Sequence, residues 1–178
     1  AAGLNRIHIG LESGSDRVLK KVKKGVDKAT HIKAGQKIKA AGMQLSEYVM
    51  PGLGGRRLSE EHAAETADAL NRIDPDFIRI RTLAVPNGSP LAEQLASGEF
   101  SKMTDVETAA EIRRFINDLE GITSQVVSDH ILNLFEEVEG RLPEDKPRML
   151  DALDRFLELD AGDQMLYQVG RRLGLFSR

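Results

Sequence analysis

The sequence of 178 residues contains no cysteine, so neither a disulfide nor a cysteine-ligated metal or cluster can form within this chain. Aromatic residues make up only 4%, with no tryptophan, and no apolar run approaches the roughly 18 residues that suggest a membrane span. The formal net charge of −3 argues against a general binder of phosphate backbones, although Lys20, Lys21, Lys23 and Lys24 form a local basic cluster. We therefore expect neither a membrane partner nor a clear nucleic-acid partner.

The remaining composition, 40% hydrophobic and 30% charged, is typical of a globular protein. The first residues do not resemble a signal peptide, which makes a cytoplasmic location the expectation. The chain runs from Ala1 almost at once into a strand pattern, as a domain cut in its middle would.

The first 90 residues alternate between strand and helix patterns. In residues 6–12, Ile7, Ile9 and Leu11 alternate with polar or small residues, the period of two expected for a strand with two different faces. Further patterns predict strands at 43–50 and 77–85, and helices around Val18 and Leu19, at 27–41 and at 58–73. This order indicates βαβ units and therefore a parallel sheet.

From Gly88 onward, apolar residues recur at helical spacing and no further strand pattern is evident. The expected helices cover residues 90–97, 104–118, 121–138, 146–159 and 161–173. We therefore predict an α/β region over residues 1–90 and an α-helical extension over residues 91–178.

Ligands of parallel α/β proteins bind at the carboxyl ends of strands, which here are residues 10–15, 50–55 and 82–89. Each of these segments contains glycine and small or polar residues. Glu12 can accept hydrogen bonds from the vicinal hydroxyls of a ribose, and it can equally serve as a helix-capping carboxylate.

Three segments carry a resemblance to a known family: RIHIGLESGSDRVLKKVKKG, AAGMQLSEYVMPGLGG and FIRIRTLAVPNGSPL. In order and spacing they resemble strands four to six of the partial (βα) TIM-like barrel of radical S-adenosylmethionine enzymes. In that family, three cysteines of a CxxxCxxC loop hold a four-iron, four-sulfur cluster, and cleavage of S-adenosylmethionine gives a 5′-deoxyadenosyl radical that abstracts a substrate hydrogen. The later helices resemble the extension of members described as iron–sulfur oxidoreductases.

The resemblance implies that the chain is a fragment of such an enzyme, inactive alone because the cluster cysteines are absent. It also implies that the residues named next bind S-adenosylmethionine. Glu12 and Ser13 would lie at the ribose, Lys24 near the cofactor carboxylate, Tyr48 and the loop with Gly52, Gly54 and Gly55 near the adenine, and Leu83 beside the adenine. The loop reads GLGG where many relatives have GLP followed by G, so its geometry departs from the family pattern.

Other polar residues have two interpretations each. Arg79 and Arg81 share one strand face and would either bind an anionic substrate in the barrel lumen or lie solvated on an edge strand. His130, with Asp129 or Glu136 as neighbour, would be a general acid or base or simply a helical residue. His31 and His62 are expected on helix surfaces, and no pair of histidines has the i, i+4 spacing of a metal pair, so no metal site is predicted.

Two other classes of protein stay open. The chain could be a non-catalytic binding module that self-associates through a sheet edge exposed beside the missing strand three. It could also belong to another (βα)-barrel lyase or aldolase, although no lysine at a strand end favours Schiff-base chemistry.

Overall fold

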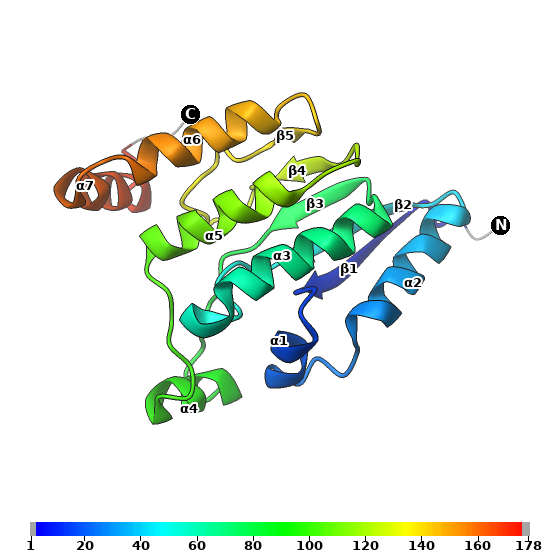
Figure 1. The fold of residues 1–178 in the computed structure, drawn as a ribbon, viewed down its shortest axis with the longest axis horizontal. Coiled ribbons are helices and arrows are strands. Elements are labelled where there is room, and N and C mark those ends of the chain that lie inside the picture. Colours follow the sequence, from blue (N-terminus) through cyan, green and yellow to red (C-terminus); the bar gives the residue numbers. More distant parts are fainter. Residues whose placement is uncertain (1–2, 176–178) are drawn as a thin grey trace.

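The computed structural model of the chain describes residues 3–175. Its centre is one sheet whose strands lie in chain order (Figure 1). These are β1 (Arg6–Glu12), β2 (Gln44–Val49), β3 (Phe77–Ile80), β4 (Gln125–Val127) and β5 (Gly140–Arg141). The first four are parallel, and β5 runs antiparallel to β4. The fold is thus mixed α/β with a mostly parallel sheet, as the order of patterns predicted.

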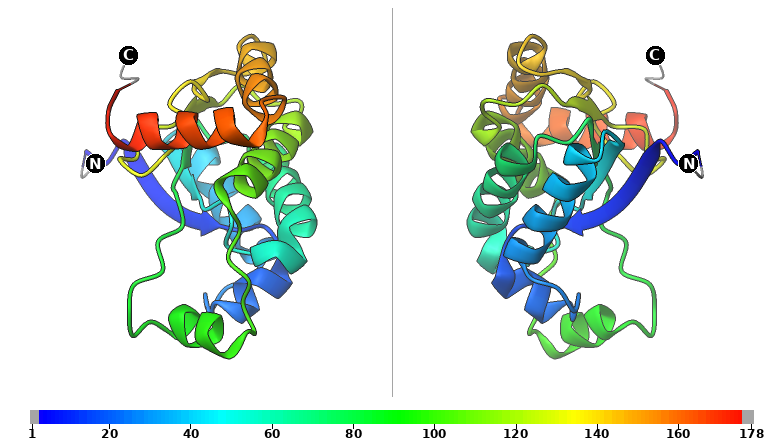
Figure 2. Two further views of the ribbon diagram at one scale, coloured as in Figure 1. Left: turned by 90° about the vertical axis from the view of Figure 1, so that its left-hand side faces the viewer. Right: turned by 90° about the vertical axis from the view of Figure 1, so that its right-hand side faces the viewer.

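Four helices lie side by side over one face of the sheet (Figures 1 and 2). They are α2 (Lys28–Ala40), α3 (Gly55–Ile73), α5 (Asp105–Asp118) and α6 (Lys146–Leu157). Three further helices lie around this layer: α1 (Asp16–Lys21), α4 (Pro90–Ser97) and α7 (Ala161–Arg172). No helix within residues 3–175 is long and apolar enough to cross a membrane.

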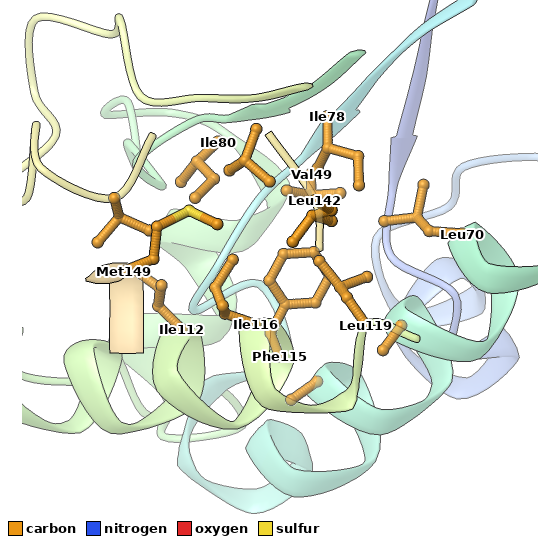
Figure 3. Close-up of a cluster of buried hydrophobic side chains, with 14 of the residues drawn as sticks. Val49, Leu70, Ile78, Ile80, Ile112, Phe115, Ile116, Leu119, Leu142 and Met149 are labelled. Atoms are coloured by element: carbon orange, nitrogen blue, oxygen red, sulfur yellow. The ribbon is translucent and has the colours of Figure 1, made fainter. Parts of the chain in front are cut away.

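The alternation of residues along the strands places the main core between the sheet and these helices. Val49, Ile78 and Ile80 lie near Phe115 and Ile116 of α5, as Figure 3 shows. Burial of such aliphatic side chains stabilises a fold by about 1.5–3 kcal/mol each. The other face of the sheet carries polar residues, so the two faces have different roles.

The predicted helix at 121–138 is wrong. Residues 125–127 form β4, because Val126 and Val127 suit a strand and Gln125 extends the sheet by donating from its backbone N–H to the carbonyl of Asp76. Ile122, Phe135 and Val138 are buried, but they lie on irregular backbone, so their helical spacing was misleading. The expectation that no strand follows Gly88 is therefore also wrong.

Two element boundaries also differ from the predictions. Helix α3 begins at Gly55 instead of Leu58, and β3 ends at Ile80 instead of continuing to Val85. The division at residue 90 stays a prediction, and the main core draws on residues from both sides of it.

Candidate functional site

The carboxyl ends of three strands meet at one edge of the sheet. The backbone carbonyl of Glu12, at the end of β1, accepts a hydrogen bond from the backbone N–H of Met50 at 3.0 Å. The backbone N–H of Arg81 in turn donates to the carbonyl of Val49 at 2.9 Å. These bonds join the ends of β1, β2 and β3 directly, which confirms the prediction of adjacent parallel strands.

Glu12 lies at a local irregularity of β1. The pairing register of β1 with β2 shifts between Gly10 and Glu12, and Glu12 has a φ of 62°, which is uncommon for a residue other than glycine. Its carboxylate accepts a hydrogen bond from Nζ of Lys24 at 2.7 Å, and both side chains are partly exposed. A Cβ atom on Gly10 would lie 3.0 Å from Oε1 of Glu12 and 3.2 Å from Nζ of Lys24, so glycine leaves room for this ion pair.

A buried histidine of α3 ties the first two strand ends together. The expectation of surface positions is wrong for both histidines, because His31 of α2 is 6% exposed and His62 is 3% exposed. Its Nδ1 lies 2.8 Å from the hydroxyl of Ser13, and its Nε2 lies 3.1 Å from the carbonyl of Met50. Burial lowers the pKa of His62 to about 4, so the ring is neutral at pH 7. The Nε2–H therefore donates to Met50, and the hydroxyl of Ser13 donates to Nδ1.

The turn after β1 packs closely against α3. The backbone N–H of Gly14 donates to the hydroxyl of Thr66 at 2.9 Å, and the hydroxyl of Ser15 donates to Glu61 at 2.6 Å. Gly14 touches the helix backbone itself, since a Cβ at this position would lie 2.1 Å from the carbonyl oxygen of Glu65. The position therefore requires glycine.

The glycine-rich loop after β2 is held from the opposite side by α5. The buried carboxyl group of Glu111 accepts a hydrogen bond from the backbone N–H of Gly52 at 2.6 Å. Burial raises the pKa of Glu111 to about 7. Gly55, the first residue of α3, has a φ of 62° and packs against Phe100, while Leu83 packs in the same small cluster of buried residues.

The open face of the sheet carries Tyr48 next to Gly10, its Cα partner on β1. The guanidinium of Arg81 lies over the ring of Tyr48 at 4.8 Å from the centroid. Arg79 and Arg81 both contact the carboxylate of Asp129. Because β3 lies between β2 and β4, the edge-strand interpretation of these arginines is wrong.

A cavity of about 600 Å³ lies elsewhere, between the ends of β3 and β4 and the helices α5 and α7. Gly52 and Leu83 contribute to its lining, together with Ile112, Asn133 and Phe135. The other predicted cofactor and substrate residues do not line it. The cavity thus borders the glycine loop, and Glu12 is not among its lining residues.

The structure thus divides the predicted residues into three groups. Glu12, Ser13, Lys24 and Tyr48 lie around the end of β1, although the hydroxyl of Ser13 already bonds to His62. Gly52, Gly54, Gly55 and Leu83 gather in and beside the loop after β2. His130 lies on a loop, outside any helix, and within residues 3–175 its buried Nδ1 has no hydrogen-bond partner.

Sequence reasoning missed Thr66 and Glu111, and it gave other roles to His62 and Asp129. His62 and Thr66 follow the same helical spacing as Ala63, Ala67 and Leu70, which marks the buried face of α3. This periodicity could have indicated that His62 is buried. The same kind of signal exists for Glu111, which precedes Phe115 by four residues on the buried face of α5. No comparable signal exists for Asp129, whose partners lie 50 and 48 residues away in the chain.

The fold and the strand-end edge define a mixed α/β protein of the class that binds ligands at the carboxyl ends of parallel strands. No family model matches the sequence. Two curated relatives are both named tRNA uridine(34) acetyltransferase. The chain is 29% identical over 106 residues to that of Methanocaldococcus infernus, and 28% identical over 115 residues to that of Methanocaldococcus jannaschii.

These matches include 59% and 62% of this chain, and the chain spans only 20% of the length of each relative. Among solved structures, the archaeal Methanocaldococcus infernus Elp3 with an N-terminal deletion has a TM-score of 0.60 and 23% sequence identity. That match covers 85% of this chain and 36% of the other. The chain thus has the fold of a region of that protein.

Proposed function

We propose that the chain is the cofactor-side part of a radical S-adenosylmethionine enzyme that acts on a uridine of tRNA. Two resemblances support this proposal. The three segments within residues 6–91 resemble strands four to six of the radical S-adenosylmethionine barrel. The similar curated proteins are named for action on tRNA uridine. In this proposal, β1 to β3 are a section of a partial (βα) barrel whose open, polar face is its lumen.

The observation that carries the proposal is the junction of the three strand ends with Glu12 at its rim. The carboxylate of Glu12 is held by Lys24, and the adjoining loop is fixed by His62 and Glu111. Such fixed strand ends give a ligand a preorganised site, because little conformational entropy is lost on binding. The same edge carries Tyr48, the Cα partner of Gly10, whose ring stacks on His8 and lies under the guanidinium of Arg81.

The residues fit the nucleoside part of S-adenosylmethionine. Glu12 would accept hydrogen bonds from the ribose hydroxyls, and Lys24 would attract the cofactor carboxylate. Ser13 would lie beside Glu12 at the ribose. The loop with Gly52, Gly54 and Gly55, together with Tyr48 and Leu83, would border the adenine. Bound to an iron–sulfur cluster, S-adenosylmethionine supplies a 5′-deoxyadenosyl radical. The chain has no cysteine, so its own residues do not fit the cluster.

The names of the relatives bear on the reaction type proposed for the whole enzyme. Both are named acetyltransferases, so they give no support to the label of oxidoreductase. We therefore propose a role for this chain in holding and orienting the cofactor, while transfer of an acyl group is a proposal for the complete enzyme.

Replacement of Glu12 by glutamine tests the proposal. The Glu12→Gln variant should bind both adenosine and S-adenosylhomocysteine about tenfold more weakly, because the charged acceptor for the ribose is lost. The Lys24→Gln variant should weaken binding of S-adenosylhomocysteine more than binding of adenosine, because only S-adenosylhomocysteine carries a carboxylate. Isothermal titration calorimetry at high ligand concentration measures both effects. The exposed Glu93→Gln variant is the matched control, and equal affinities for wild type and Glu12→Gln would contradict the proposal.

A second candidate function is that of an interaction module. Within residues 3–175, β1 pairs with β2 on one side only, and such an unpaired strand edge seeks another strand. This candidate predicts a mass that rises with protein concentration in size-exclusion light scattering. A monomeric mass throughout the micromolar range would exclude it, whereas the cofactor proposal requires no self-association.

A further inference from the structure

Two arginines on the open face of the sheet converge on one carboxylate. Arg79 lies in β3 and Arg81 follows it, so both side chains point to the face opposite the helices. The guanidinium of Arg79 contacts Oδ2 of Asp129, and that of Arg81 contacts Oδ1 at 2.7 Å. Burial would raise the pKa of Asp129, but the two guanidiniums outweigh it and lower the pKa. The carboxylate is therefore fully charged at neutral pH.

The carboxylate of Asp129 does not satisfy all the hydrogen-bond donors of Arg79 and Arg81. Each of its two oxygens is used by one arginine. Nε of Arg79 is buried and has no hydrogen-bond partner within residues 3–175. A buried donor without an acceptor costs about 1–3 kcal/mol. A group with three or more acceptor oxygens would use the same two guanidiniums and also supply this third acceptor.

Aromatic rings hold both guanidiniums in place. Arg81 lies over Tyr48, and Arg79 lies 5.9 Å from the ring centroid of Phe77. A third arginine, Arg6 of β1, lies over the same Phe77 ring at 4.5 Å from its centroid. It adds a positive charge to this face. Asp129 is 46% exposed at its side chain, so a ligand can reach and displace it. The arginines are thus preorganised while their present partner is accessible.

We propose that Arg79 and Arg81 form a binding site for a phosphate ester and that Asp129 occupies the phosphate position when no ligand is bound. Arginine binds phosphate through two parallel N–H donors, and the tetrahedral oxygens reach both side chains at once. Displaced Asp129 turns to solvent. Because its carboxylate and the phosphate bind the same two guanidiniums, Asp129 competes with the ligand and lowers the affinity for phosphate.

This inference deepens the proposed function, on which it rests for the choice of ligand. If the open face is the barrel lumen, the phosphate belongs to the nucleotide that carries the reacting uridine. The site lies next to Tyr48 of β2, and this one strand separates it from the edge at Glu12. Its test needs neither cofactor nor cluster, so it can succeed or fail separately from the titrations of adenosine and S-adenosylhomocysteine.

The test measures binding of uridine 5′-monophosphate, uridine and inorganic phosphate to the 178-residue chain at low ionic strength. Calorimetry gives the affinities, and the NMR signal of Nε–H of Arg79 reports the new acceptor. Asp129→Asn should strengthen binding of the monophosphate about tenfold, and Arg81→Gln should weaken it at least about tenfold. Arg81→Lys keeps the charge but loses the two parallel donors, so it should also weaken binding. The exposed Arg57→Gln variant is the matched control.

The outcomes distinguish an RNA phosphate from free inorganic phosphate. They also distinguish a binding site from an ion pair that only holds the loop of Asp129 on the sheet. Tighter binding of a uridine-containing oligoribonucleotide than of the monophosphate assigns the site to an RNA phosphate, and equal binding of inorganic phosphate assigns it to the free ion. If Asp129 serves only to attach its loop to the sheet, Asp129→Asn lowers thermal stability and gains no phosphate affinity. That result, or unchanged affinity in both Arg81 variants, overturns the proposal.

Discussion

Replacing Gly14 by alanine is expected to lower the free energy of unfolding by about 3 kcal/mol or more. The added Cβ would lie 2.1 Å from the carbonyl oxygen of Glu65 and 2.7 Å from the Cα of Thr66, and both are backbone atoms of α3. The turn and the helix must separate, which also breaks the hydrogen bond from Gly14 to Thr66. Urea denaturation followed by circular dichroism measures the loss.

The matched control for this substitution is Gly162→Ala at the exposed start of α7. A Cβ there would lie 3.2 Å from Oδ1 of Asp160, a side-chain atom, and a shift of a few tenths of an ångström relieves this contact. We expect a change of less than about 0.5 kcal/mol. If Gly14→Ala were as stable as Gly162→Ala, the close contact of the first strand end with α3 would be contradicted.

Replacing Glu47 by glutamine is expected to stabilise the protein at alkaline pH. Glu47 is fully buried, and its Cα partners on the two neighbouring strands are Ile9 and Ile78. Burial raises the pKa of Glu47 from 4.5 to about 8, because the charged form is disfavoured away from water. Glutamine resembles the neutral acid in shape and cannot ionise.

The direction of the pH dependence follows from proton binding in the two states. Between pH 4.5 and about 8 the folded protein keeps the proton of Glu47, whereas the unfolded chain has released it. The contribution of Glu47 to stability is therefore complete below pH 4.5 and is lost as the pH rises through 8. At pH 9 the free energy of unfolding of the Glu47→Gln variant should exceed that of the wild type by on the order of 5 kcal/mol, and near pH 4.5 the two should be equal.

Unfolding curves of both proteins from pH 4.5 to 9 measure this difference. His62 and Glu111 titrate in the same interval, but they do so in both proteins and cancel in the comparison. A difference that is independent of pH would contradict burial of an ionisable carboxyl group at residue 47.

Much of the fold could be predicted because the signals in residues 6–80 are local. The alternation of Ile7, Ile9 and Leu11 marked β1, and the βαβ order indicated parallel strands. The errors arose where tertiary contacts decide the conformation. Residues 125–127 are too few for a clear period of two, and they become a strand because β3 offers free hydrogen-bonding groups beside them.

The candidate site was predictable only in part. The rule that ligands bind at carboxyl ends of parallel strands identified the segments around Glu12 and Gly52, which the structure joins. The groups that hold these segments come from the helices. Burial of His62 and Glu111 depends on how α3 and α5 pack on each other, and Asp129 reaches the arginines from a loop that was predicted to be helical.

The central claim is that the carboxyl ends of β1, β2 and β3 form one nucleoside-binding edge with Glu12 at its rim. The most direct measurement is a titration of ¹⁵N-labelled protein with S-adenosylhomocysteine, followed by amide NMR shifts. We predict that the shifts concentrate in residues 10–15, 48–55 and 81–85. Shifts confined to the cavity residues Asn133, Phe135 and Arg171, with no change at Glu12, would contradict the claim.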